Sequence, residues 1–226
     1  MRSFWHIEKR KHGLFGIIRQ LAQSGPQSAR TIGLDPDDGK FSPKTGMIVL
    51  GLGSNQSGRW GASDQILRRA AAELGKAGLK VVAISDVYLT APVGGGRQNP
   101  YANAVITVES PLSPHALLQL LKSVERRAGG RSTRLWAPRA LDIDIIDYKG
   151  LVRNWRRRGR PDVAHQRSCL VLPHAAAHIR PFVLTPLMQA HPAWRHPVFR
   201  RRASGLLRSL PQGHDGIILR QAQPLL

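Results

Sequence analysis

The chain has 226 residues, 42% of them hydrophobic, so it is long enough and apolar enough to form one good-sized domain with a core. Its formal net charge of +20, from 34 Lys and Arg against 14 Asp and Glu, favours anionic partners such as nucleotides, nucleic acid or an anionic membrane surface. No apolar run approaches the ~18 residues needed to cross a membrane, and the single cysteine, Cys169, excludes an internal disulfide. We therefore expect a cytoplasmic protein without a membrane partner.

Residues 1–46 differ from the rest of the chain. They begin with a basic stretch that contains a short amphipathic piece, residues 13–22, and continue into sequence rich in Ser, Gly, Pro and Asp. The apolar part is short for a signal peptide, and Arg19 interrupts it. We predict a basic, disordered extension. Because Met47 opens a strand directly, a true start at Met47 is an open alternative.

From Met47 onward the pattern predicts a compact domain over residues 47–210. In chain order, we expect a buried strand at 47–52, a glycine turn at 51–55, a helix at 63–76 ended by Gly78, a strand at 80–88, a loop at 90–96, a strand at 103–108, a helix at 114–127 capped by Ser113, strands at 140–148 and 170–172, and helices at 184–189 and 203–210. This order predicts an α+β fold, a ferredoxin-like two-layer sandwich with a mainly antiparallel sheet and flanking helices. Residues 211–226 are assigned to a C-terminal tail.

The glycine segment 51–55 matches neither common nucleotide-binding loop. It lacks the final glycine of a dinucleotide fingerprint and the lysine of a P-loop. We expect Gly51 and Gly53 to allow a tight exit from the first strand, which brings backbone amides close to a site.

Asp142 and Asp144 lie one residue apart in an apolar, β-branched run. Side chains alternate along a strand, so both carboxylates should project from the same face. Two like charges held side by side are unfavourable unless cations neutralise them, and hard oxygen ligands suit magnesium. The pair therefore predicts a magnesium site. The alternative is an Asp-x-Asp motif on a solvated edge strand.

Cationic side chains surround this pair in the sequence. The basic residues are Arg131, Arg134, Arg139, His174, His178 and Arg180. Guanidinium groups bind phosphate oxygens bidentately, and arginines beside metal-binding carboxylates are typical of phosphoryl transfer from a nucleoside triphosphate. The alternative is ordinary surface charge in a very basic protein.

Five ordered segments resemble the 6-hydroxymethyl-7,8-dihydropterin pyrophosphokinase family. Residues 51–55 are similar to its opening motif, 90–94 and 98–105 to its two pterin loops, 136–145 to its signature, and 172–174 with 180–184 to its closing segment. The resemblance covers residues 47 to about 192. It implies transfer of diphosphate from ATP to the hydroxymethyl group of a reduced pterin, with release of AMP, in folate synthesis.

The resemblance also implies roles for individual residues. The catalytic set comprises Arg131, Arg139, Asp142 and Asp144, of which Asp142 and Asp144 hold two Mg²⁺ ions. The ATP contacts are Glu125, Arg131, Trp136, Arg139, His174 and Arg180. The pterin contacts are Thr90, Val93, Tyr101, Asn103 and Phe182, where the two aromatic rings sandwich the pterin and Asn103 bonds its edge. Core packing is the alternative role for the two aromatic residues.

The chain departs from the family pattern at Leu135, where a basic residue is usual, so Arg134 could supply that phosphate contact. The arginine-rich insertion at 153–160 has no motif meaning. Two other functions stay open: a nucleic-acid-binding protein driven by charge, and a different magnesium-dependent phosphoryl or nucleotidyl transferase. The distance of Gly53 and Ser54 from the carboxylates argues against the second. We expect small-molecule substrates, no specific nucleic-acid partner, and a monomer.

Overall fold

The computed structural model describes residues 46–91, 99–129, 139–155, 169–211 and 218–225. All of them belong to one compact unit, Lys44–Leu226. Within these ranges no helix has both the length and the apolar character to cross a bilayer. The predicted extension at residues 1–46 lies, except for its last residue, outside the described ranges, and it stays a prediction.

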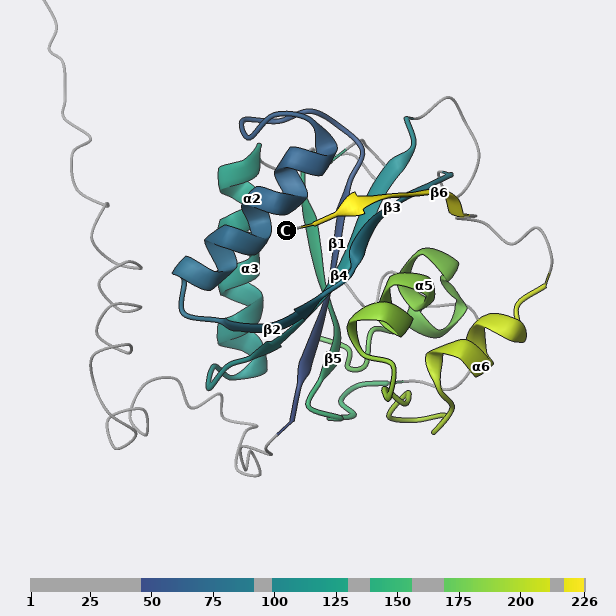
Figure 1. The fold of residues 1–226 in the computed structure, drawn as a ribbon. Coiled ribbons are helices and arrows are strands. Elements are labelled where there is room, and N and C mark those ends of the chain that lie inside the picture. Colours follow the sequence, from purple (N-terminus) through teal and green to yellow (C-terminus); the bar gives the residue numbers. More distant parts are fainter. Residues whose placement is uncertain (1–45, 92–98, 130–138, 156–168, 212–217, 226) are drawn as a thin grey trace, which may run out of the picture. The chain divides into compact units, whose positions relative to one another are not determined.

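A six-stranded sheet forms the centre of the fold (Figure 1). Its strands are β1 (Ile48–Ser54), β2 (Lys80–Ile84), β3 (Asp86–Thr90), β4 (Tyr101–Glu109), β5 (Asp142–Tyr148) and β6 (Ile218–Pro224). The order is β5-β1-β4-β3-β6, with β2 also paired to β4, and every pairing between these strands is antiparallel. This confirms the predicted α+β fold with a mainly antiparallel sheet.

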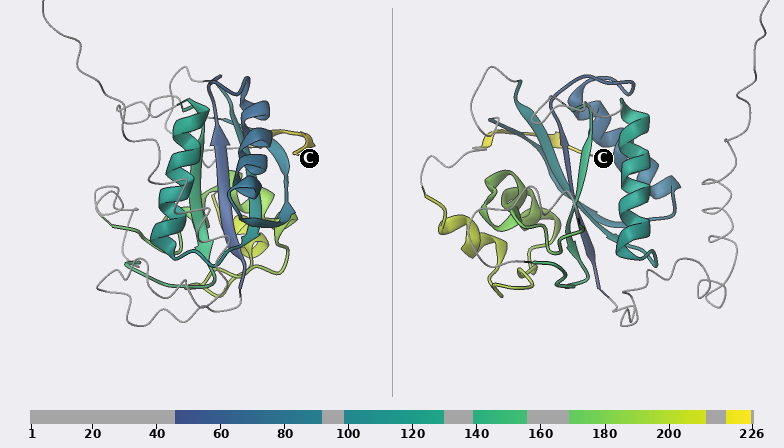
Figure 2. Two further views of the ribbon diagram at one scale, coloured as in Figure 1. Left: turned by 90° about the vertical axis from the view of Figure 1, so that its left-hand side faces the viewer. Right: turned by 180° about the vertical axis from the view of Figure 1, so that it is seen from behind.

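Helices flank the sheet on both faces, as Figures 1 and 2 show. Helices α2 (Ser63–Lys76) and α3 (Pro114–Ala128) cover one face, whereas α5 (Pro181–Ala190), α6 (Ala203–Arg208) and the short 3₁₀ helix η2 (Ala177–Ile179) lie on the other. The two long helices begin and end almost where the sequence predicts. The helical layer of α5 and α6 is an addition to the expected two-layer sandwich.

Local chemistry explains where α2 and α3 begin and end. The hydroxyl of Ser113 accepts a hydrogen bond from the amide of Ala116 at 3.3 Å, which confirms Ser113 as an N-cap. Gly78 follows α2 with φ +91, a left-handed conformation that suits glycine. Each helix buries one apolar stripe against the sheet, with Ile66, Leu67, Ala70 and Leu74 on α2 and Leu117, Leu121 and Val124 on α3.

The predicted single strand at 80–88 is wrong, because Ser85 divides it into β2 and β3. The backbone amide of Ser85 donates to the carbonyl of Val105 at 2.9 Å, and its hydroxyl accepts from the amide of Val105, also at 2.9 Å. A side chain thus replaces a ladder partner at this position. As a result, β4 pairs with β2 along one half of its length and with β3 along the other.

The register between β1 and β5 shifts where Leu50 pairs with Ile145 and Val49 with Asp147, which leaves Ile146 as the extra residue of a bulge. Before the bulge, Asp142 and Asp144 share a face. After it, the alternation is reversed. Asp147 accepts a hydrogen bond from Trp194, which follows α5, whereas the hydroxyl of Tyr148 donates to the carbonyl of Leu112, just before α3.

The C-terminal part departs most from expectation. The predicted strand at 170–172 is reduced to one bridge between Leu172 and Arg153. The segment assigned to a tail contains β6, which pairs with β3. Leu225, the residue after β6, is buried, and the carbonyl of Leu225 accepts a hydrogen bond from the Arg68 side chain at 2.7 Å.

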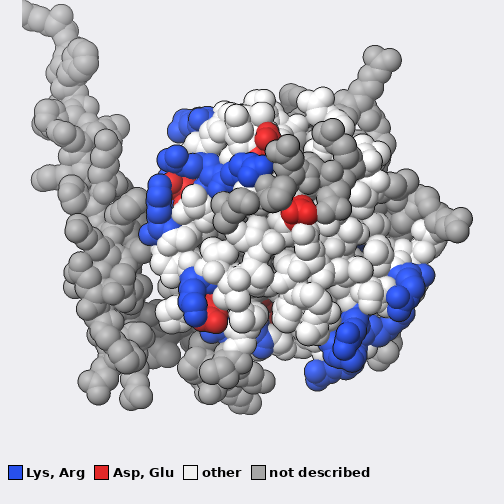
Figure 3. All heavy atoms as spheres, viewed as in Figure 1, with Lys and Arg blue, Asp and Glu red and all other residues white. Residues whose placement is uncertain are grey.

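Positive side chains gather over α6 and the loop before it (Figure 3), where Arg195, Arg200, Arg201, Arg202 and Arg208 are exposed.

Candidate active site

A cavity of about 330 Å³ opens on the sheet face that carries α5, and it is lined by β1, β3, β4, β5 and the start of α5. This volume lies at the lower end of the range for small-molecule pockets. The described residues that line it include most of the predicted site: Thr90, Tyr101, Asn103, Arg139, Asp142, Asp144, His174, Arg180 and Phe182. Gly51 and Gly53 also line the cavity. The structure therefore brings together residues from all five segments that resemble the family.

The floor of the cavity is made by Gly51 and Gly53 of β1. Gly53 lies opposite Asn103 on one side and Asp142 on the other, and Gly51 lies between Val105 and Asp144. A Cβ atom on Gly53 would come within 3.3 Å of the Asn103 Oδ1, and one on Gly51 within 3.2 Å of Ile146. The expected glycine turn is thus wrong, since both glycines lie inside β1. Because they have no side chains, they leave space above β1 for the cavity between β4 and β5.

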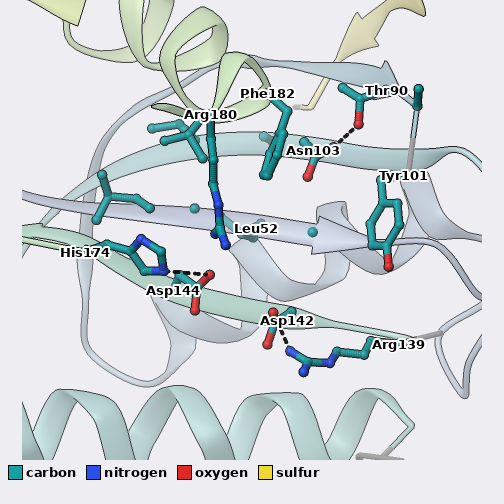
Figure 4. A pocket seen from close by; sticks show the side chains of 17 residues that line it. Leu52, Thr90, Tyr101, Asn103, Arg139, Asp142, Asp144, His174, Arg180 and Phe182 are labelled. Atoms are coloured by element: carbon teal, nitrogen blue, oxygen red, sulfur yellow. Dashed lines mark hydrogen bonds and ion pairs between the residues drawn. The ribbon is translucent and has the colours of Figure 1, made fainter. Parts of the chain in front are cut away.

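One end of the cavity is aromatic and amide-lined (Figure 4). The rings of Tyr101 and Phe182 lie on either side of Asn103, one from β4 and the other from the first turn of α5. The Asn103 amide donates to the Thr90 hydroxyl at 2.8 Å, which fixes how the amide is turned. This end offers two aromatic faces and a donor and acceptor pair, the groups that bind a flat heterocycle by its faces and its edge.

The other end of the cavity is acidic and basic. Arg139 donates to the Asp142 carboxylate at 2.7 Å, and the backbone of Arg139 is held by Asn55, whose Oδ1 accepts from the Arg139 amide at 2.9 Å. Burial and the neighbouring Asp144 raise the pKa of Asp142 to about 6, although Arg139 opposes the shift. Asp142 therefore ionises fully only near neutral pH or when a cation is added.

Asp144 faces His174, whose Nε2 lies 3.8 Å from its Oδ2. The Nδ1 of His174 accepts from the amide of Ala176 at 3.1 Å, so its proton resides on Nε2 and points toward Asp144. Burial lowers the pKa of His174 to about 4, and the ring is neutral at pH 7. Burial alone would raise the pKa of Asp144, but His174 and Arg180 outweigh it and hold that pKa below its ordinary value. Because His174 is neutral at pH 7, the positive charge that acts most strongly on Asp144 at that pH is the guanidinium of Arg180.

The two carboxylates fit a hard divalent cation. They project side by side into the cavity, and the Asp144 side chain is 39% exposed, so its oxygens are accessible. Among the described residues no cluster of three or more His, Cys, Asp or Glu side chains could hold a metal. Magnesium is commonly bound by one or two carboxylates together with water and substrate phosphates. The donor set present is therefore one that suits magnesium shared with a phosphate ligand.

Other predicted residues lie elsewhere or outside the described ranges. The carboxylate of Glu125 is buried behind β5, where it accepts a hydrogen bond from the amide of Ile143 at 2.9 Å, and Glu125 is not among the residues that line the cavity. Val93, Arg131 and Trp136 fall outside the described residues, as do Arg134, Leu135 and most of the insertion at 153–160. The roles assigned to all of these stay predictions.

Some lining residues were missed by sequence reasoning. Val105 and Ile146 face the cavity beside Asn103 and Asp144, two residues further along β4 and β5. Period-two alternation could have found both, because residues i and i+2 share a face of a strand. Asn55 was noted only as part of a motif, and the sequence carries no signal that it holds the backbone of Arg139.

Comparison with known proteins shows the family of the chain. Residues 49–192, more than half of the chain, match the family model for 7,8-dihydro-6-hydroxymethylpterin-pyrophosphokinase. A 2-amino-4-hydroxy-6-hydroxymethyldihydropteridine pyrophosphokinase of Methylorubrum extorquens is 37% identical over 144 residues, which are 63% of this chain and 81% of that protein. The enzyme of the same name from Aquifex aeolicus is 32% identical over 154 residues, 68% of this chain and 86% of its own length.

Solved structures show the same fold. The wild-type HPPK-DHPS protein of Plasmodium falciparum, solved with pterin and p-hydroxybenzoate, superposes with a TM-score of 0.51 at 15% identity. The match covers 72% of this chain and 42% of that longer protein. The chain belongs to the 7,8-dihydro-6-hydroxymethylpterin-pyrophosphokinase family.

Proposed function

We propose that the protein transfers the terminal diphosphate of ATP to the hydroxymethyl group of 6-hydroxymethyl-7,8-dihydropterin, releasing AMP, as a step of folate biosynthesis. The observation that carries this proposal is a single cavity with an aromatic and amide end, a carboxylate and arginine end, and a glycine floor between them. Family membership and the names of the relatives support the same reaction.

In this reaction the substrate hydroxyl oxygen forms a bond to the β-phosphorus of ATP. The bond between that phosphorus and the oxygen bridging to the α-phosphate breaks, AMP leaves with that oxygen, and the hydroxyl proton is released. Such transfers depend mainly on positioning and on neutralising charge. Tyr101, Phe182 and Asn103 would orient the pterin so that its hydroxymethyl group points along the floor toward β5.

Asp142 and Asp144 would hold two magnesium ions, whose chemistry when bound would be to neutralise phosphate charge. Arg180 supplies a permanent positive charge beside Asp144 for phosphate oxygens. His174 is neutral and presents its Nε2–H in the same direction, so it can donate to a phosphate oxygen without adding charge. Arg139 is held by Asn55 and Asp142 and would stay in place when the phosphates arrive.

The exposed arginines near α6 make this part of the surface positive but do not by themselves define a specific nucleic-acid site. In the described ranges the exposed large hydrophobic side chains are Val82, Val152, Met188 and Leu219, none of which can stack on a base. We propose that the protein acts as a monomer. Size-exclusion chromatography with light scattering tests that state.

The direct experiment combines the protein with ATP, Mg²⁺ and the reduced pterin alcohol and measures AMP by chromatography. We expect AMP from the wild-type protein and roughly a thousandfold less from Asp142→Ala, because metal-bound charge stabilisation is lost. Asp64→Ala, which removes an exposed carboxylate from the first turn of α2, is the matched control. No AMP from a folded wild-type protein refutes the reaction, and near-normal turnover by Asp142→Ala refutes the metal assignment.

A further inference from the structure

The strand that carries both site carboxylates is the terminal strand of the described sheet. In the strand order β5 has β1 on one side, and Ile143 lies opposite Leu52. Amides alternate in direction along an antiparallel strand, so one set points away from the partner strand. The amide of Ile143 belongs to that set, and its partner is a side chain, the carboxylate of Glu125 on α3, at 2.9 Å.

Glu125 is held in this position by a second contact. Its side chain is 2% exposed, and the same oxygen, Oε1, accepts from Lys122 one helical turn earlier at 2.5 Å. Lys122 compensates the buried negative charge. Its ammonium also favours the ionised forms of the two site carboxylates: it opposes the rise in the pKa of Asp142 and contributes to the lowered pKa of Asp144. Glu125 thus has a charged partner on its own helix and a backbone partner on β5.

Stability alone does not account for this arrangement. A buried ion pair contributes little net stability compared with a well-packed apolar pair, because both charges lose their hydration. Apolar side chains already surround Glu125 on α3, where Leu121 and Val124 are fully buried. What the carboxylate adds is a charge-assisted hydrogen bond to one specific amide, and such bonds are short and directional.

The amide concerned is that of the residue between Asp142 and Asp144. Any rotation of the peptide planes around Ile143 would turn both neighbouring side chains, and so change the distance between the two carboxylates. We propose that Glu125 is a positioning residue that fixes the backbone at Ile143 and thereby the spacing of the Asp142 and Asp144 carboxylates toward a divalent cation. This inference rests on the proposed function. The hydrogen bond between Glu125 and the Ile143 amide, and the affinity of the protein for a divalent cation, can both be measured without turnover.

A nucleotide contact by Glu125, as the family resemblance implies, gives a different pattern of effects. A direct contact would weaken ATP binding and leave cation binding by the free protein unchanged. A positioning role instead changes cation affinity, and it is preserved by any side chain that presents an acceptor at the same place. Groups that orient metal ligands from outside typically change metal affinity by 10-fold to 100-fold when they are removed.

The test compares Glu125→Ala, Glu125→Gln and Glu125→Asp. Glutamine keeps an oxygen acceptor at the same reach, whereas aspartate keeps the charge but is one methylene shorter and draws back from the Ile143 amide. Two readouts need no substrate: hydrogen exchange of the Ile143 amide by NMR, and Mn²⁺ affinity by electron paramagnetic resonance. We expect faster Ile143 exchange and about tenfold weaker Mn²⁺ binding for Glu125→Ala and Glu125→Asp, with Glu125→Gln near wild type.

Glu73→Ala is the matched control, because Glu73 is also a nearly buried helical glutamate, and its ion pairs, to Arg69, Lys76 and Arg127, lie away from β5. It should lower the melting temperature without changing Mn²⁺ affinity. Unchanged Mn²⁺ affinity in Glu125→Asp, or an equal loss in Glu73→Ala, overturns the positioning role. Failure of the wild-type protein to form AMP would refute the proposed reaction and leave these two measurements interpretable. If Glu125→Ala does not fold, Glu125→Asp and Glu125→Gln decide between the outcomes.

Discussion

The side-chain amide of Asn103 donates a hydrogen bond to the hydroxyl of Thr90 at 2.8 Å, and both residues are buried. The bond runs diagonally between neighbouring strands β3 and β4, because Thr90 is paired with Tyr101 and Asn103 with Tyr88. It uses one amide hydrogen and leaves Oδ1 and the second hydrogen for a ligand. Thr90 was expected as a pterin contact, and the structure shows that its side chain also orients Asn103.

Thr90→Val should weaken pterin binding by about 1 kcal/mol, or about fivefold, since Asn103 loses the acceptor that orients it. Thr90→Ser keeps the hydroxyl and should bind nearly as well as the wild type. Titration calorimetry with the pterin substrate measures both. Equal affinities for the wild type and the valine variant would show that Asn103 is oriented by other contacts.

Tyr101→Ala should weaken pterin binding by about 1 kcal/mol or more, because one aromatic face of the cavity is lost. Tyr101→Phe retains the ring and should retain most of the affinity. Fluorescence titration of the pterin separates the two variants. A pterin affinity that is unchanged in Tyr101→Ala would assign this ring to packing only.

Acidification should destabilise the fold through His196. This residue is fully buried, and its Nδ1 accepts from the amides of Val198 at 3.1 Å and Phe199 at 3.3 Å. Burial, with a smaller effect of His178, lowers its pKa from 6.5 to about 4. Because the unfolded chain binds the proton more readily, the contribution of His196 is present above pH 6.5 and is lost as pH falls toward 4, by about 3 kcal/mol.

His196→Asn isolates this effect, since its Oδ1 can accept from the same amides and cannot titrate. Urea denaturation at several pH values between 7 and 4 should show a shallower loss of unfolding free energy for the variant than for the wild type. The comparison is needed because burial also lowers the pKa of His174 and His178. Parallel curves for the two proteins would contradict the assignment.

Trp194→Phe should lower the free energy of unfolding by about 1 to 3 kcal/mol. The indole Nε1 donates to Oδ2 of Asp147 at 2.8 Å, and Asp147 is 5% exposed with its other oxygen bonded to the amide of Gly150. Removing the indole donor leaves a buried carboxylate with fewer partners. In an Asp147→Asn background the same change should cost less, and equal costs in the two backgrounds would indicate that only ring packing matters.

Much of the site could be predicted because it depends on strand periodicity. Asp142 and Asp144 had to share a face, and the segments around Tyr101, Asn103 and Phe182 belonged to motifs that the fold brings to the same cavity. The helices α2 and α3 were predicted almost to the residue, since apolar stripes, a serine cap and a glycine stop all agree there.

The parts that could not be predicted depend on contacts between distant segments. Nothing local shows that Ser85 would exchange hydrogen bonds with Val105, or that the residues after 217 would pair with β3. The glycines of β1 were taken for a turn because glycine is common in turns, whereas here their missing side chains create the cavity floor. The position of Glu125 behind β5 likewise follows from helix packing, which a motif does not encode.

The bulge at Ile146 decides which way the end of β5 faces. Ile146 and Asp147 follow one another on the face that carries α5, since Ile146 lines the cavity and Asp147 accepts from Trp194. Strict alternation over the same residues would place Asp147 on the opposite face, among the apolar side chains under α2 and α3, and would turn the large ring of Tyr148 away from Leu112. The extra residue thus lets one strand present two carboxylates to the cavity at its start and keep a third, buried carboxylate on the same face at its end.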